Sequence, residues 1–366
     1  MLKGIAMLAV ILVHTSQKFH LPPSIETVCD FGQYGCQLFL LISGYLAYKS
    51  LKGNWLNFLK RRFVAIVPGY WLTIAIFLLL NFLWRKVGLS PQYLQNRSLL
   101  AICTNVLLLH GLVPSCNNNV VPGGWYVGTT AILYLLTPLL KKCLRNANAI
   151  AASILFSALL LCGNILFQLA IAFLTGTFDY SGNNHFLYFF FLNQLPVYVL
   201  GMWFAEFEEN KNSTQLAKEG RKFWLGGFSI LLICFGMSFL PLVIVPMVLP
   251  TLLGWSFLGI FIGCHAWCDQ MNTPPSWYKQ KIACLGRNSY GAYLIHSIFA
   301  YYLTHIVNKL LARVGIEHNF AIFVPALCVV MALTYFSAIF YGHIIKVIST
   351  PLVQLERSHS PAVQQP

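Results

Sequence analysis

Long apolar runs follow one another along almost the whole chain, and short polar stretches that carry most of the charged residues separate them. No stretch keeps up the period-two alternation of a barrel strand, so the pattern favours helices. A helix needs about 20 consecutive apolar residues to cross the hydrocarbon of a bilayer. The runs predicted to cross are 4–20, 34–51, 63–84, 123–140, 149–175, 186–205, 223–240, 243–264, 288–310 and 319–346.

An eleventh apolar segment, 98–113, is short and contains Asn105 and His110. Basic residues collect on the cytoplasmic side of membrane proteins, and this rule decides whether the segment crosses. If it does not cross and the N-terminus is cytoplasmic, 18 of the 24 basic residues lie inside and six lie outside. If it crosses, eight lie inside and 16 outside. The six outside residues of the favoured arrangement are Lys18, Arg85, Lys86, Arg97, Lys309 and Arg313.

The sequence therefore predicts an all-α, polytopic membrane protein with about ten transmembrane helices and both termini cytoplasmic. Composition agrees, because 57% of the 366 residues are hydrophobic and only 9% are charged, against about a quarter charged in soluble domains. The net charge of +14 is explained by topology signals, so no nucleic-acid partner is expected. Residues 1–348 form one membrane domain, and the polar segment 349–366 is expected to be a disordered cytoplasmic tail.

In the stretch AVILVHTSQ, residues 9–17, the apolar run ends at a histidine, His14. His14 lies 11 residues after Lys3, which is roughly 16 Å along a helix and predicts a position near the middle of the membrane. An ionisable group at that depth is costly unless it faces a cavity, so function is the default hypothesis. The alternative is a neutral imidazole that bonds to a neighbouring helix, and the histidine by itself leaves both open.

Three adjacent cations, Lys60, Arg61 and Arg62, stand at the cytoplasmic end of the third predicted span. They can serve as topology anchors alone. They also suit a phosphate-bearing ligand, because arginine binds phosphate oxygens through two parallel hydrogen bonds. No cluster of cysteines or histidines has the spacing of a metal site, and no metal is expected.

Five further residues are candidates for contacts with a substrate. Trp125 and Tyr126 follow the loop CNNNVVPGG and fit either an interfacial aromatic belt or a stacking platform for a sugar. Asp30 lies in an outer loop and is a candidate for the same role. Ser43, on the second span, can donate a hydrogen bond to a substrate, and His296 either faces the cavity of His14 or serves as a packing contact.

Several stretches together resemble the integral-membrane acyltransferase family 3, which includes O-acetyltransferases of bacterial surface polysaccharides. KGIAMLAVILVH (3–14) is similar to the family's R-G-[IL]-A-x-x-x-V-x-x-x-H, and GCQLFLLISGYLAYKS (35–50) to its G-x-x-x-F-[FL]-x-[IL]-S-G-[YF]-L. FLKRRFVAIVPGYW (58–71), GGWYVGTTAILYLLTPLL (123–140) and LGRNSYGAYLIH (285–296) resemble later motifs in the same order. The order and spacing make the likeness specific.

The resemblance implies a bacterial inner-membrane enzyme that moves an acetyl or other short acyl group from cytoplasmic acetyl-CoA to a hydroxyl of an extracytoplasmic or lipid-linked saccharide. It implies that His14 is catalytic and that Arg62 binds coenzyme A, with Lys60 and Arg61 beside it. Acetyl-CoA is then a donor substrate, and no permanently bound cofactor is expected. The expected partners are the acyl-CoA, the saccharide and the bilayer.

The chain departs from the family pattern at two positions. The second arginine of the family's R-x-x-R falls at Ala65, and a glutamate of the fourth motif falls at Thr130. These departures keep a non-catalytic relative open as an alternative. A second alternative is a secondary transporter or flippase for a saccharide, although the chain lacks the internal repeats and paired intramembrane carboxylates of many transporters.

Overall fold

The computed structural model describes residues 1–86, 98–113, 115–145, a few positions between 158 and 174, 186–210, 213–240, 245–268, 276–313, 315 and 320–358. Every regular element in this part of the chain is helical. The first elements are α1 (Leu2–Ser16), α2 (Pro23–Asp30), η1 (Phe31–Tyr34), α3 (Gly35–Ser50), α4 (Trp55–Lys86), α5 (Leu99–Val106), η3 (His110–Leu112) and α6 (Trp125–Arg145). They are followed by α8 (Phe186–Phe189), α9 (Phe191–Asn210), α10 (Ser213–Met237), α11 (Val245–Cys268), α12 (Trp277–Arg287), α13 (Ser289–Ser297), η4 (Ile298–Leu303), α14 (Thr304–Arg313) and α15 (Phe320–Ser358).

Four helices in the described part are long and apolar enough to cross a membrane, namely 55–86, 125–144, 248–266 and 320–351. The chain is therefore a multi-pass membrane protein. The other predicted spans that fall on described residues are also helical, but the span 149–175 lies mostly outside the described residues. The segment 98–113 gives only the eight-residue helix α5, which is too short to cross, and the chain then turns at Leu108 with φ 59°.

Two helices end at other residues than the predicted spans. Helix α1 ends at Ser16 rather than at residue 20, so His14 lies in its last turn. The C-terminal helix continues to Ser358 and includes the first ten residues of the segment expected to be disordered. Leucine, glutamine, glutamate and arginine there are good helix formers, and this local preference extends the helix beyond its apolar run. Residues 359–366 lie outside the described part.

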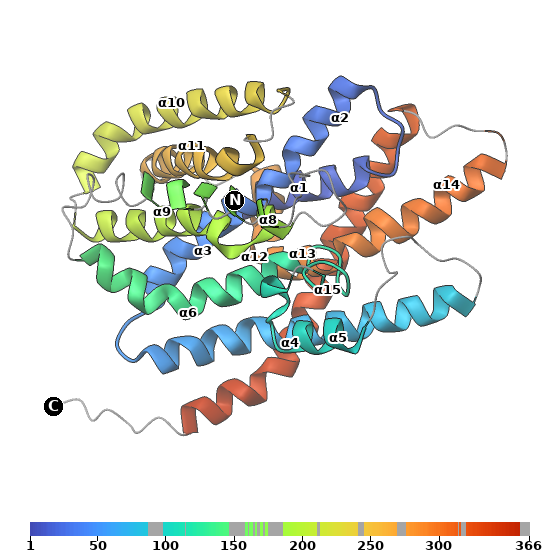
Figure 1. The fold of residues 1–366 in the computed structure, drawn as a ribbon, viewed down its shortest axis with the longest axis horizontal. Helices are drawn as coiled ribbons and strands as arrows, with labels where there is room; N and C mark the ends of the chain where they lie inside the picture. The colour runs from blue at the N-terminus through green and yellow to red at the C-terminus, as the bar shows by residue number, and fades with distance from the viewer. Residues whose placement is uncertain are drawn as a thin grey trace.

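Helix α1 is the central element of the site. It contacts α2, η1, α3, α12, α13, η4 and α15, and Figure 1 shows it surrounded by elements from both halves of the chain. Its side chains Met7, Val10 and Ile11 are fully buried. Because segments far apart in sequence enclose α1, the residues at its two ends meet side chains that no local pattern relates to them.

Helices α3 and α9 cross so closely that each needs a glycine at the contact. A Cβ atom on Gly44 would lie 2.0 Å from the Tyr198 carbonyl oxygen, and one on Gly201 would lie 1.9 Å from the Leu41 carbonyl oxygen. Small residues of this kind let membrane helices approach backbone to backbone. The crossing fixes the position of α3, which supplies one wall of the site.

Replacing Gly201 with alanine is expected to separate α3 from α9, because the obstructing atom belongs to the backbone and cannot rotate away. Overpacking of this kind costs about 1–3 kcal/mol, so the detergent-solubilised variant should melt at a lower temperature than the wild type. Gly226→Ala on α10 is the matched control, since nothing lies within 4 Å of its added Cβ. Equal melting temperatures for Gly201→Ala and the wild type would contradict the close crossing.

Candidate active site

A cavity of about 220 Å³ lies between helices α1, α3, α4, α6 and α13. Its walls are aromatic and hydroxyl-bearing, with two cations at one end. The lining residues are Lys3, Phe39, Ser43, Arg62, Ala65, Ile66, Tyr126, Val127, Thr130, Tyr134, Ser289, Tyr290 and Tyr293. The predicted candidates Arg62, Ser43 and Tyr126 are therefore brought together in one place.

Arg62 is held rigidly at the cationic end of this cavity. Its Nη2 donates 3.1 Å to the Leu46 carbonyl oxygen and also to the Ser50 hydroxyl, and its guanidinium lies 4.9 Å from the centre of the Tyr134 ring. Lys3 of α1 supplies the second positive charge. The two cations make this end of the cavity a suitable site for an anionic group.

The other two predicted cations do not line the cavity. Arg61 is exposed, and its Nη2 donates 3.0 Å to the Ser50 carbonyl oxygen at the end of α3. Lys60 is exposed as well. Successive residues of a helix point in directions about 100° apart, so the three adjacent cations cannot all face one site.

The two departures from the family pattern, Ala65 and Thr130, line this same cavity from opposite helices, α4 and α6. An arginine and a glutamate at these positions would place two opposite charges in one small space. Here both positions are neutral, so neither leaves an uncompensated buried charge. The two substitutions thus change one feature of the cavity together.

A row of five aromatic rings runs from the cavity wall to the end of α1. Tyr126 lies 5.1 Å from Tyr293, Tyr293 lies 5.6 Å from His296, and His296 lies 5.1 Å from His14, measured between ring centres. Tyr301 follows, 5.4 Å from His14. Tyr126 also shares a 3.3 Å hydrogen bond with Ser43. A continuous row of side chains thus runs from the cavity wall to His14 and on to Tyr301.

His296 is fully buried, and its contacts show which ring nitrogen of the neutral imidazole carries the hydrogen. Its Nδ1 lies 2.7 Å from the Tyr293 carbonyl oxygen, which only accepts, so Nδ1 carries the hydrogen. The lone pair of the neutral ring is therefore on Nε2. This nitrogen has no hydrogen-bond partner among the described residues. A buried acceptor without a partner is suited to accept a hydrogen bond from the hydroxyl or amide group of a ligand.

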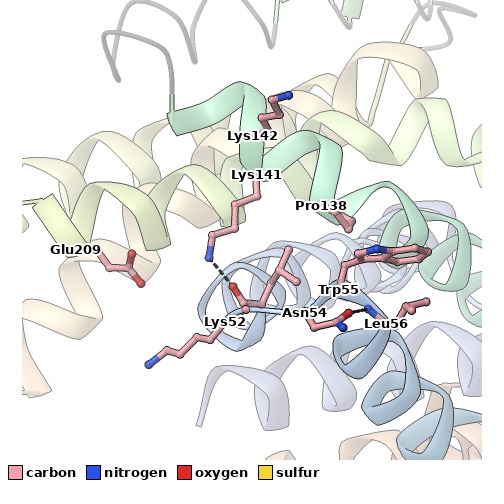
Figure 2. Close-up of a pocket in the computed structure, with 10 residues that line it drawn as sticks. Lys52, Asn54, Trp55, Leu56, Pro138, Lys141, Lys142 and Glu209 are labelled. Atoms are coloured by element: carbon pink, nitrogen blue, oxygen red, sulfur yellow. Dashed lines mark hydrogen bonds between the residues drawn. The ribbon is translucent and has the colours of Figure 1, made fainter.

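An open pocket of about 1110 Å³ lies beside the end of α3 and the start of α4, and Figure 2 shows its lining. Lys141 reaches into it and donates 2.9 Å to the Leu51 carbonyl oxygen. Trp55 is 51% exposed, so one of its faces is available for stacking. Lys52 and Lys142 add positive charge at the rim, and Glu209 adds one negative charge.

The outer-loop residues lie differently from the expected sugar platform. Trp125 is buried and stacks on Phe189, with ring centres 4.6 Å apart. The Gly123 carbonyl oxygen accepts 2.8 Å from the Tyr293 hydroxyl, and the Gly124 carbonyl oxygen lies 2.9 Å from Nε2 of His110. The loop before α6 therefore folds inward and supports the cavity wall, since these backbone groups find partners in the core rather than in solvent.

Asp30 is the last residue of α2 and does not line the cavity. Burial, together with the nearby Glu26 carboxylate, raises the pKa of Asp30. Among the described residues, no group of three or more histidine, cysteine or acidic side chains is arranged to hold a metal ion.

The sequence interpretation missed Lys3, Tyr293 and Tyr301 as site residues. A signal existed for Lys3, because its 11-residue separation from His14 is close to three helical turns and places both on one face. Tyr301 gave no such signal. It is 287 residues from His14 in the chain, and only the packing of η4 against α1 brings the two together.

A family model described as an acyltransferase domain matches residues 1–340. No curated protein and no solved structure is similar enough to this chain to count as a match.

Proposed function

The chain belongs to the integral-membrane acyltransferase family 3, and we propose that it moves an acetyl or other short acyl group from acyl-CoA to a hydroxyl of a saccharide. The observation that carries this proposal is the row of side chains from the cation-lined cavity to His14. An anionic donor at one end and a base at the other are what an acyl transfer across the protein requires.

In this proposal the donor enters from the end marked by Lys3 and Arg62, which the distribution of basic residues assigns to the cytoplasm. Both termini are cytoplasmic, and the enzyme lies in a bacterial inner membrane. The diphosphate of coenzyme A binds Lys3 and Arg62, and the pantetheine arm passes Ser43 and Tyr126 toward His14. The path in this proposal is enclosed by protein, as the hydrocarbon core of a membrane demands of any polar path.

We assign the nucleotide end of the donor to the pocket of Figure 2. Trp55 and Arg62 are seven residues apart on α4, which is roughly 10 Å along the helix and a span that a nucleotide can bridge. The exposed Trp55 ring can stack on a base, and Lys52 at the rim can neutralise a phosphate. Helix α4 would thus bind both the base and the diphosphate of the coenzyme.

The chemistry assigns His14 as general base. Its imidazole takes the proton of an acceptor hydroxyl while the hydroxyl oxygen attacks the thioester carbonyl carbon. The new C–O bond forms, the C–S bond breaks, and the departing thiolate of coenzyme A takes the proton from the imidazolium. The acceptor-only Nε2 of buried His296 is positioned to accept a second hydrogen, and saccharides carry several hydroxyls close together.

The proposal is tested with sealed membrane vesicles that contain the protein and a lipid-linked or polysaccharide acceptor. Radiolabelled acetyl-CoA added to the cytoplasmic side should transfer its label to saccharide, and unlabelled acetyl-CoA should compete. Vesicles without the protein are the control. Transport of intact saccharide without any dependence on acyl-CoA would instead support the transporter alternative. Binding of acyl-CoA without transfer to any acceptor would indicate a non-catalytic relative.

A further inference from the structure

Three polar atoms meet at the end of α1. The Tyr301 hydroxyl lies 2.5 Å from His14 Nδ1 and 3.1 Å from the Gln17 Oε1 atom. His14 Nδ1 is itself 3.5 Å from Gln17 Oε1. His14 and Gln17 are one turn apart at the end of α1, whereas Tyr301 comes from the π-helical turn η4.

The direction of each hydrogen bond in this group follows from Gln17. Its Oε1 is a carbonyl oxygen and can only accept, and the Tyr301 hydroxyl donates its single hydrogen to it at 3.1 Å. The Tyr301 oxygen then accepts from His14, which places a hydrogen on Nδ1. A neutral imidazole has one N–H group, and the lone pair of His14 is therefore on Nε2.

We infer that Tyr301 and Gln17 are positioning residues that hold His14 in the tautomer with hydrogen on Nδ1, so that Nε2 is the nitrogen that receives the proton. The inference rests on the proposed role of His14 as general base. A base locked in the wrong tautomer keeps its position and loses most of its activity, which is why a partner for Nδ1 matters to the reaction.

The π-helical turn explains how two residues of one segment reach His14. His296 and Tyr301 are five residues apart, and in a regular α-helix they would point about 140° away from each other. A π-helix forms i→i+5 hydrogen bonds and turns less per residue than an α-helix, so the turn that follows His296 brings Tyr301 closer to the same face. Both rings lie beside His14, at 5.1 Å and 5.4 Å between centres. The Ile298–Leu303 turn thus allows both His296 and Tyr301 to lie beside His14.

The tautomer can be measured without any acyl transfer. The protein is labelled with ¹⁵N-histidine, placed in detergent micelles, and the His14 signals are identified by their loss in His14→Gln. We expect a protonated Nδ1 and an unprotonated Nε2 at neutral pH, distinguished by their ¹⁵N chemical shifts. In Tyr301→Phe the population protonated on Nε2 should rise. A protonated Nε2 in the wild type, or no change in Tyr301→Phe, would overturn the inference.

Tyr302→Phe is the matched control, because it removes a neighbouring hydroxyl in the same turn that contacts Asn81 at 3.5 Å instead of His14. Gln17 is exposed, so Gln17→Leu and Gln17→Glu provide a test in which the core is untouched. Leucine should disturb the His14 tautomer, and glutamate, which keeps an accepting oxygen, should preserve it. If both variants behave alike, the inference fails.

Activity adds a second readout. Tyr301→Phe is expected to lower kcat at least about 10-fold with the KM for acyl-CoA unchanged, and Tyr302→Phe to leave both unchanged. If the tautomer experiment fails while transfer still depends on His14, only this inference is lost. If His14 is dispensable for transfer, the proposed function of His14 itself is wrong.

Discussion

Replacing His14 with glutamine is expected to lower acyl transfer by roughly 10²- to 10⁴-fold, the usual contribution of a general base. Glutamine fills similar space and keeps a polar end, but it cannot take up a proton. The loss should appear in kcat, because His14 lies at the far end of the row of rings from the cations that hold the donor. Release of free coenzyme A in the presence of acceptor measures the rate.

His343→Gln is the matched control. His343 is an exposed histidine on α15 and does not line the cavity. Its variant should transfer acyl groups at the wild-type rate. If His14→Gln retains full activity while it binds acyl-CoA and melts like the wild type, the chemistry does not pass through this imidazole and the base lies elsewhere.

Arg62→Ala is expected to raise the KM for acyl-CoA by about 10- to 100-fold with a much smaller change in kcat. A hydrogen bond to a charged group contributes about 1.5–3 kcal/mol, and each 1.4 kcal/mol is a factor of ten in affinity. Arg62 also bonds to Leu46 and Ser50, so the melting temperature of the variant is measured alongside. Arg62→Lys keeps the charge but loses the paired N–H donors of the guanidinium. Its KM for acyl-CoA should lie between that of the wild type and that of Arg62→Ala.

Arg61→Ala provides the internal comparison, because Arg61 is the adjacent residue, has the same side chain and faces away from the cavity. Its KM for acyl-CoA should stay within about threefold of the wild type, as for an exposed charge whose contribution is under about 1 kcal/mol. An equal effect of the two substitutions would mean that the donor responds to the general positive charge of this surface rather than to the cavity.

Ala65 and Thr130 illustrate why single departures from a family pattern are hard to interpret from sequence. In the chain they are 65 residues apart and look like two separate losses. In the structure they line one cavity, so a pair of opposite charges is absent together. When both members of an ion pair are absent, no unpaired charge is left behind, whereas the loss of one member leaves the other without its partner. The joint absence of both charges favours a cavity of altered polarity over a cavity that has lost its function.

The sequence by itself determined the all-helical membrane architecture and most helix positions, because a run of apolar residues must be helical to satisfy its backbone in lipid. It also marked His14 as a candidate, since an ionisable residue in an apolar run is costly without a reason. The catalytic role of His14 and the donor-binding role of Arg62 are what the resemblance of the motifs implies. These are properties of one segment at a time, and periodicity records them directly.

Only the tertiary structure decided which residues act on one another. The sequence left Trp125 open between an interfacial belt and a sugar platform, and the structure stacks it on Phe189 in the core. Of the three adjacent cations 60–62, only Arg62 lines the cavity. The partner of His14 is Tyr301, brought to it by a π-helical turn 287 residues away in the chain. Contacts of this kind depend on how helices cross and on the extra residue of a π-helical turn. Local sequence patterns predict neither of these.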